Sequence, residues 1–177
     1  VTLIENDDDS SYDAAIISEP EYMFIKMTDS VDMKIYDTYD NSKLISLGED
    51  DVRYSVFDFG TGEKLKFSDI AQGTVVGVLA SADKKLFKFF VNLNEMSGQV
   101  TAKSDGGKLE IDGTEYNTSK YFDENYASAI KAGTKADFTL GINGEIAVAD
   151  VRGGKFVTAY LINAAQEKSL SKKLQIK

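Results

Sequence analysis

Short runs of β-branched and aromatic residues alternate with turn-forming residues along most of the chain. The runs 75–80 and 86–91 are separated by a Ser-Ala-Asp-Lys segment, and a later pair of runs is separated by Ile-Asn-Gly-Glu at 142–145. Apolar runs joined by such short turns predict β-hairpins. Turn signals recur about every 8 to 12 residues, a spacing typical of small barrels or sandwiches. The pattern therefore predicts a mainly β protein.

An internal repeat with an offset of 60 residues underlies part of this pattern. The stretch 69–91 aligns without a gap with 128–151, and upstream 43–47 resembles 108–112. Such a repeat predicts two copies of one structural unit. The matched positions are Ile70 with Ile130, Gly73 with Gly133, Val76 with Ala136, Val78 with Phe138, Leu86 with Ile146 and Val91 with Val151.

Together these patterns predict two small antiparallel repeats, barrel-like or sandwich-like, with short helical turns at 67–70 and 126–130. We place the first β-rich repeat, which includes an N-terminal acidic hairpin, at 1–95 and the second at 96–177. The division falls where 94–98 interrupts the strand pattern. The second repeat is expected to end with a helical turn within 163–172 and a strand at 174–176.

The residue types that are missing exclude several kinds of chemistry. The 177 residues include no histidine and no cysteine, so Ser-His-Asp and Cys-His catalysis, thiolate metal sites and histidine zinc sites are excluded. We therefore expect no enzyme, although a pair of carboxylates of the kind that glycosidases use stays possible among 29 Asp and Glu residues. Disulfides are excluded as well.

Charge and hydropathy limit the partners. The net charge of −9 disfavours nucleic acid and anionic lipid surfaces and favours cations as ligands. No run of about 18 apolar residues exists, so no membrane span is expected. The chain opens on Val1 without a basic region, so we expect no signal peptide and interpret the chain as a piece of a longer protein.

An acidic stretch near the N-terminus is the one candidate metal site. Glu5, Asp7 and Asp9 alternate along the chain and Asp13 follows four residues later. Alternate acidic residues in a tight loop can point their oxygens at one calcium ion. Two departures favour the other interpretation, a solvated acidic turn between the segments 1–4 and 14–18: the first ligand is Glu, and Ser10 stands where such loops have Gly.

Nine tyrosines offer a second possibility, a platform that stacks on sugar rings. They are spread along the whole chain and fall mostly at strand or turn positions, where tyrosine is an ordinary half-buried residue. Both interpretations stay open at this point. The tyrosines are Tyr12, Tyr22, Tyr36, Tyr39, Tyr54, Tyr116, Tyr121, Tyr126 and Tyr160.

Several phrases of the sequence resemble a known group of proteins. The acidic stretch, the segment 107–116, the Tyr-Phe-Asp at 121–123, the Ala-Gly-Thr at 132–134 and the segment 144–151 are similar to β-rich repeat modules of large Gram-positive cell-surface proteins, which often carry S-layer homology domains. The resemblance implies a secreted setting at the cell wall or cell surface, with other domains of the same protein as partners. It also implies a calcium loop at Glu5, Asp7, Asp9 and Asp13, and it supplies no catalytic residue.

The leading functional hypothesis is a non-catalytic structural or adhesive spacer of a bacterial surface protein, in which stacked β-domains need no concave site. The alternatives are a module that binds cell-wall or dietary polysaccharide and a fragment of a carboxylate-based glycoside hydrolase. A groove lined by Tyr and Asp would favour binding. A smooth, elongated surface would favour the spacer.

The calcium interpretation predicts that calcium raises the thermal stability of the chain and that a chelator reverses the rise, because a ligand of the native state stabilises it by mass action. At a calcium concentration of about 100 times Kd the gain would be about 2.7 kcal/mol. Replacing Asp7 and Asp9 by Asn should abolish it, whereas E49Q/D50N should not. A melting temperature that calcium does not change would support the other interpretation, in which the acidic stretch is a solvated turn.

Overall fold

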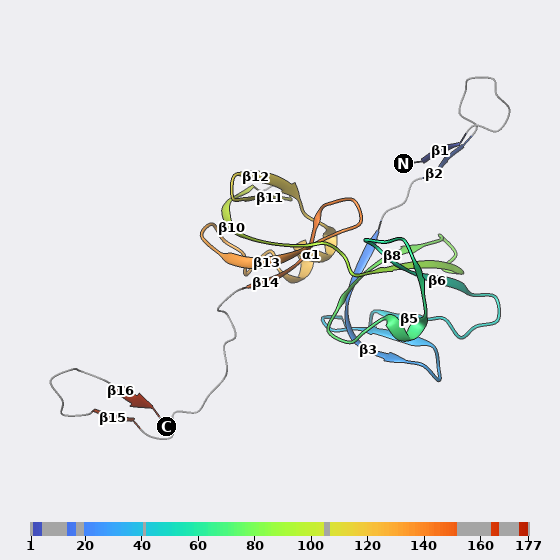
Figure 1. Cartoon of the computed structure of the whole chain (residues 1–177), viewed down its shortest axis with the longest axis horizontal. Coiled ribbons are helices and arrows are strands. Elements are labelled where there is room, and N and C mark those ends of the chain that lie inside the picture. The colour runs from blue at the N-terminus through green and yellow to red at the C-terminus, as the bar shows by residue number, and fades with distance from the viewer. Residues whose placement is uncertain are drawn as a thin grey trace.

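A computed structural model describes residues 20–40, 42–104 and 107–151, together with the backbone of four short strands outside these ranges (Figure 1). The four strands form two antiparallel pairs. The first pair joins β1 (Thr2–Ile4) with β2 (Ala14–Ile16), and the second joins β15 (Ala164–Gln166) with β16 (Leu174–Ile176). The described elements make the protein mainly β, as predicted.

Seven strands build the first sheet, in the order β5-β4-β3-β8-β9-β6-β7. We refer to residues 20–93, which contain this sheet, as the first lobe. A short 3-10 helix, η1 (Phe67–Asp69), precedes β8. The strands are β3 (Glu21–Asp29), β4 (Lys34–Asp37), β5 (Leu44–Ser46), β6 (Arg53–Asp58), β7 (Lys64–Leu65), β8 (Val75–Ala80) and β9 (Leu86–Val91).

Five strands build the second sheet, in the order β12-β11-β10-β13-β14, and every neighbouring pair is antiparallel. Residues 95–151 form the second lobe, in which helix α1 (Lys120–Asn125) packs against β14 and also reaches β3 of the first lobe (Figure 1). The strands are β10 (Glu95–Ser104), β11 (Lys108–Ile111), β12 (Thr114–Asn117), β13 (Lys135–Leu140) and β14 (Ile146–Val151).

The two hairpins predicted from the apolar runs are confirmed. Strands β8 and β9 occupy the predicted runs 75–80 and 86–91, and β13 pairs with β14 across the Asn-Gly turn. Each turn contains one residue in the left-handed region, Lys84 with φ of 57° and Gly144 with φ of 82°. Glycine adopts this conformation without steric cost, which explains why Asn-Gly is such a strong turn signal.

The expectation of purely antiparallel, barrel-like repeats needs two corrections. Strand β6 pairs with β9 in parallel, because the chain passes through β7, η1 and β8 before it returns, and a parallel pair requires such a long crossover. The described strands also leave both sheets open, since the sheet orders end at β5, β7, β12 and β14 without closing into a barrel.

The predicted helical turns are only partly correct. The first falls at η1. At the second, 126–129 form a turn in which the Ala129 amide donates to the Tyr126 carbonyl oxygen at 3.0 Å, but the α-helix itself, α1, ends just before the predicted range. Its start is fixed by the Ser119 hydroxyl, which accepts a hydrogen bond from the Phe122 amide at 3.1 Å. Near the C-terminus, Ala164–Gln166 is strand rather than helix and pairs with the predicted strand at 174–176. The rest of 163–172 lies outside the described residues.

The sheets change between β9 and β10, at residues 92–94. Strand β10 already begins at Glu95, so the interruption is shorter than the expected 94–98. The division at 95/96 remains a prediction.

The aligned positions of the sequence repeat occupy similar places, with one exception. Ile70, Ile130, Val76, Ala136, Val78 and Phe138 are all buried. Leu86, by contrast, is 58% exposed while Ile146 is fully buried, so the expected equivalence is wrong here. Helix α1 packs against β14, the strand that contains Ile146, whereas no α-helix lies in the described part of the first lobe, which contains Leu86. The upstream match between 43–47 and 108–112 does not hold in the sheets. Residues 108–111 form β11, which lies next to β10 as β4 lies next to β3, whereas 44–46 form β5 at the edge of the first sheet.

This difference predicts unequal costs for two matched substitutions. Ile146→Ala should lower the free energy of unfolding by about 2–5 kcal/mol, because it opens a cavity in a closed core. Leu86→Ala should change it by less than about 1 kcal/mol, since most of that side chain already meets water. Urea unfolding of both variants measures the difference. Equal losses would contradict the described burial.

Candidate functional site

The two lobes meet at a tyrosine that is buried between them. Tyr22 extends from β3 and is 1% exposed. Its hydroxyl donates to Oε1 of Glu145 at 2.5 Å and accepts the Ile142 amide hydrogen at 2.8 Å. Both partners belong to the β13–β14 turn of the second lobe. The hydroxyl therefore has a donor and an acceptor from the opposite lobe, which removes the cost of burying it.

A second tyrosine crosses the boundary in the opposite direction. Tyr121, on α1, donates its hydroxyl hydrogen to Oδ2 of Asp37 at 2.8 Å, and its oxygen accepts the Phe24 amide hydrogen at 3.0 Å. Asp37 is 0% exposed, and its Oδ1 accepts the amide hydrogens of Tyr39 and Asp40 at 2.8 and 2.9 Å. A buried carboxylate is tolerated only when it is hydrogen-bonded in this way.

Lys43 places a positive charge at the same boundary. Its Nζ lies 5.3 Å from the ring centroid of Tyr121 and donates to the Tyr22 carbonyl oxygen at 3.0 Å. A cation at this distance is attracted by the electron-rich face of the ring. Lys43 therefore contacts both tyrosines that join the lobes.

Two glycines let the lobes approach closely. A Cβ atom on Gly141 would lie 2.6 Å from Cζ of Tyr22, and one on Gly77 would lie 2.7 Å from Cδ1 of Ile142. Both distances are too short for any larger residue without a shift of the partner. Each lobe thus contributes one glycine where the side chains of the other lobe pack.

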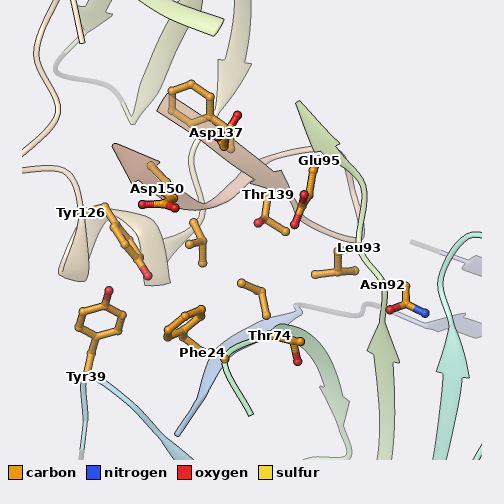
Figure 2. Close-up of a pocket in the computed structure, with 15 residues that line it drawn as sticks. Phe24, Tyr39, Thr74, Asn92, Leu93, Glu95, Tyr126, Asp137, Thr139 and Asp150 are labelled. Atoms are coloured by element: carbon orange, nitrogen blue, oxygen red, sulfur yellow. The ribbon is translucent and has the colours of Figure 1, made fainter. Parts of the chain in front are cut away.

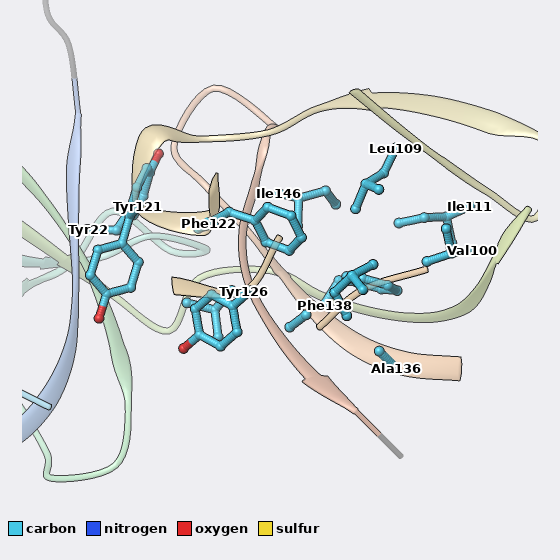
Figure 3. Close-up of a cluster of buried hydrophobic side chains, with 14 of the residues drawn as sticks. Tyr22, Val100, Leu109, Ile111, Tyr121, Phe122, Tyr126, Ala136, Phe138 and Ile146 are labelled. Atoms are coloured by element: carbon cyan, nitrogen blue, oxygen red, sulfur yellow. The ribbon is translucent and has the colours of Figure 1, made fainter. Parts of the chain in front are cut away.

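Hydrophobic burial continues across this boundary. The core of the second lobe includes Tyr22 from the first lobe, with Phe24, Val75 and Phe90 packed at its margin. Figure 3 draws this cluster, with Phe122, Phe138 and Ile146 between the strands of the second lobe. A separate core fills the first lobe and includes Met23, Ile25 and Phe89.

Burial raises the pKa of three tyrosines above the ordinary value of 10.0. Loss of water around the hydroxyl is the main cause for Tyr22, Tyr121 and Tyr126. Hydrogen bonds to Glu145, Asp37 and Tyr39, respectively, add to the effect. These phenols are therefore neutral at physiological pH and act as hydrogen-bond donors.

A cavity of about 460 Å³ lies beside this joint, between the lobes. In Figure 2, Phe24, Tyr39 and Thr74 reach it from the first lobe, whereas Asp150 and Thr139 reach it from strands of the second lobe. Its size is within the range of about 300–1,000 Å³ that small-molecule sites usually have. We refer to this cavity as the interlobe cleft.

Aromatic rings form one side of the interlobe cleft. The centroids of Tyr39 and Tyr126 lie 5.3 Å apart with a 72° angle between the ring planes, and the centroids of Phe24 and Tyr39 lie 6.1 Å apart. Tyr126 is buried, whereas Tyr39 is 49% exposed. Tyr39 is therefore the most exposed of these three rings, and Phe24 is partly buried.

Carboxylates lie on another side of the cleft. Glu95 begins β10, and Asp137 and Asp150 face each other in the register of β13 and β14. The Ser97 hydroxyl donates to Asp137. Among the described residues that line the cleft, none is Lys or Arg. The cleft therefore combines negative charge with exposed aromatic surface.

The predicted metal ligands Glu5, Asp7, Asp9 and Asp13 lie outside the described residues. The backbone strands on either side of them, β1 and β2, do pair as a hairpin, in agreement with the sequence pattern. Within the described part of the chain, no group of three or more acidic residues is placed to hold a metal ion. In the same part, no helix is both long and apolar enough to cross a membrane.

Sequence reasoning listed the tyrosines of the joint and the cleft among its nine candidates, but it did not connect them with each other or with their carboxylate partners. Tyr22 and Glu145 are 123 positions apart, and Asp37 and Tyr121 are 84 apart. No local spacing connects such pairs. Comparison of the chain with protein-family models, with curated proteins and with solved structures finds no match.

The close approach at Gly141 predicts a destabilised variant. Gly141→Ala should lower the free energy of unfolding by about 1–3 kcal/mol, because the new methyl group displaces the Tyr22 hydroxyl from its buried partners. Gly60→Ala is the matched control, since its Cβ would meet only Asp58, at 3.5 Å. Urea unfolding compares the two, and an equal effect would contradict the described packing.

The raised tyrosine pKa values predict a stability that falls at alkaline pH. The folded state holds the phenol protons more tightly than the unfolded state, so this contribution is complete below about pH 10 and is lost as the pH rises further. Unfolding free energies measured between about pH 8 and pH 11 should fall less steeply in Y22F/Y121F than in the native chain. The exposed Tyr54 provides a control, Y54F. If the unfolding free energy of Y22F/Y121F falls with pH as steeply as that of Y54F and the native chain, the joint does not bury these phenols.

Proposed function

We propose that the chain is a non-catalytic structural or adhesive module that acts as a rigid spacer in a bacterial cell-surface protein. The observation that carries the proposal is the pair of buried tyrosine–carboxylate contacts across the lobe boundary. A spacer transmits orientation only if its lobes keep a fixed angle. The hydroxyls of two tyrosines donate two hydrogen bonds and accept two more across the boundary, and together with close packing at Gly77 and Gly141 these bonds favour such a fixed arrangement.

We also propose that the lobes are two copies of one repeat. The orders β5-β4-β3-β8-β9 and β12-β11-β10-β13-β14 correspond strand for strand. Gly73 donates to the carbonyl oxygen of Ile25 at 2.8 Å, and Gly133 donates to that of Val100 at 2.7 Å. Strand β9 has the parallel neighbour β6, and β14 has a single parallel bridge between Thr118 and Ile146 at the same side. The first lobe would then carry β6 and β7 as an extension of the shared unit.

The extracellular setting follows from the resemblance to surface modules, with other domains of the same protein as the expected partners. The net charge of −9 and the absence of cysteine are compatible with that setting. Antibodies against the chain should stain intact cells that produce it. Staining only after permeabilisation would contradict a surface location.

The rigid-spacer proposal predicts a narrow distance distribution between the lobes. Because the chain has no cysteine, spin labels can be attached at Glu63→Cys in the first lobe and Thr114→Cys in the second. Pulsed electron resonance should give one narrow peak, and adding Y22F/Y121F should broaden it, since the phenylalanine rings cannot donate to Glu145 and Asp37. A broad distribution in the otherwise native chain would overturn the rigid-spacer role.

A second candidate function is the binding of cell-wall or dietary polysaccharide. The interlobe cleft favours it, because an exposed tyrosine ring and nearby carboxylates are groups that stack on sugar rings and accept hydrogen bonds from hydroxyls. This candidate is compatible with the spacer, since a rigid joint also keeps the cleft preformed.

A further inference from the structure

The turns that close the β8–β9 and β13–β14 hairpins share one geometry. In turns 81–84 and 141–144 the amide of the fourth residue donates to the carbonyl oxygen of the first, at 2.9 and 3.0 Å. The fourth residue has a positive φ in both turns, 57° and 82°. The third residue differs, since it is Asp83 in the first lobe and Asn143 in the second. The second turn therefore has a side-chain amide where the first has a carboxylate.

An asparagine followed by a glycine is chemically labile because the two residues can react with each other. The backbone nitrogen of the glycine attacks the side-chain carbonyl carbon of the asparagine, and the side-chain nitrogen leaves as ammonia with the proton of the backbone amide. The product is a succinimide ring. Water opens the ring at either carbonyl carbon and leaves aspartate or isoaspartate. In isoaspartate the main chain runs through the side-chain carbons and is one atom longer.

The surroundings of Asn143 satisfy what this reaction needs. Asn143 and Gly144 are both exposed. No described atom lies within 4 Å of the position that a Cβ of Gly144 would occupy, so the ring has room to form beside a residue without a side chain. Asp83 differs, because its Oδ1 already accepts two hydrogen bonds within its turn, at 2.5 and 3.1 Å, and a lysine follows it. Of the two matched turns, the second is thus the reactive one.

The same turn holds the buried hydroxyl of Tyr22. The residues on either side of the Asn-Gly pair supply its two partners: the Ile142 amide donates to it at 2.8 Å, and Oε1 of Glu145 accepts from it at 2.5 Å. Ring closure requires the glycine amide to leave its hydrogen bond across the turn and to face the asparagine side chain. The contacts at both flanks oppose this movement, so the joint slows the reaction.

Isoaspartate in this turn would disturb those contacts. Oε2 of Glu145 accepts the Asn143 amide hydrogen at 3.0 Å, which orients the carboxylate. An additional main-chain atom after position 143 shifts Glu145 relative to Ile142, so the two can no longer meet the Tyr22 hydroxyl together. A buried hydroxyl that loses its partners is destabilising. The charge of an ordinary aspartate, in contrast, would lie on an exposed turn, where water screens it.

We propose that Asn143 is a site of spontaneous deamidation and that isoaspartate formed there loosens the joint between the lobes. The modification consumes only water and releases ammonia. Joint and reaction oppose each other: an intact joint slows the deamidation, and the isoaspartyl product weakens the joint. This inference rests on the joint that also carries the spacer proposal. It is independent of the surface location and of the interlobe cleft.

The first experiment measures the rate of deamidation. The whole chain is incubated at slightly alkaline pH, which promotes loss of the amide proton, and mass spectrometry follows the aspartyl and isoaspartyl forms of the tryptic peptide 136–152. Asn143 should deamidate at least about tenfold faster than Asn92, whose ring closure has a higher barrier. Asn92 is exposed too, but it precedes leucine and donates its side-chain amide to Asp58 at 2.6 Å. A rate at Asn143 no higher than at Asn92 would overturn the inference.

Variants of the joint test whether the lobes restrain the turn. Y22F removes the hydroxyl that holds the turn, and Y121F weakens the joint from α1. Both should deamidate at Asn143 several times faster than the native chain, whereas Y54F, at an exposed tyrosine, should not. Circular dichroism shows whether each variant is folded at the incubation temperature, and Y121F decides if Y22F is unfolded. Equal rates in the native chain and in the folded variants would contradict restraint by the joint.

The second experiment measures the consequence for the joint. Spin labels are attached at Glu63→Cys and Thr114→Cys after incubation, and chains with isoaspartate at position 143 should give a broader distance distribution than fresh chains. N143S, which cannot form the ring, should keep the narrow peak after the same incubation. Fresh N143D should keep it as well, since it adds the charge without the additional atom. Equal broadening in N143D would assign the effect to charge and overturn the isoaspartyl role.

Failure of this inference can be told apart from failure of the spacer proposal. A narrow peak in chains that contain isoaspartate overturns the inference and leaves the rigid spacer in place. A broad distribution in the fresh, otherwise native chain overturns the spacer and also the joint on which the inference rests.

Discussion

The contact between a buried tyrosine hydroxyl and a carboxylate of the opposite lobe is the interaction on which the rest of this structure depends. Tyr22 contacts Glu145 and Tyr121 contacts Asp37, one tyrosine from each lobe. Burying these polar groups without partners would cost a free energy comparable to a large part of the stability of a small domain. The lobes therefore have to stay together for the groups to remain satisfied. The interlobe cleft is defined by the same constraint, because its walls come from both lobes.

Apolar packing supports the polar contacts. The core of the second lobe includes Tyr22, so this lobe completes its burial only with the first lobe in place. Sheets of five and seven strands bury limited area alone, and small domains gain proportionally more from a shared boundary. Gly77 and Gly141 allow that boundary to be close. The joint thus combines shape, apolar area and hydrogen bonding.

Local patterns in the sequence were sufficient to predict the strands of the β8–β9 hairpin and the Asn-Gly turn, because alternation and turn chemistry act over a few residues. They predicted the turn at 126–130 but missed helix α1 directly before it, whose start is fixed by the Ser119 cap. Leu86 and Ile146 matched in sequence but differ in burial, because only the second lobe places a helix beside that strand position. No local pattern marks Asp37, at the end of β4, and only the tertiary structure shows that it is fully buried.

The acidic stretch was the candidate metal site in the sequence, and it lies outside the described residues; among the described residues, the carboxylates that line the interlobe cleft are Glu95, Asp137 and Asp150. They approach the aromatic ring of Tyr39 only because the lobes are joined. No spacing in the sequence relates residues on β10, β13 and β14 to a turn of the first lobe. Candidate sites formed between lobes are therefore the kind that pattern reasoning along one chain cannot detect.

Amide hydrogen exchange at Ile142 tests the joint most directly. Its amide lies in the β13–β14 turn and donates to the Tyr22 hydroxyl of the other lobe, whereas the neighbouring Asn143 amide donates to Glu145 within the same turn. If the lobes stay joined, Ile142 should exchange only as slowly as the core amides, through global unfolding. Rapid exchange at Ile142 while the core amides stay protected would show that the lobes separate in the native state and would contradict the account.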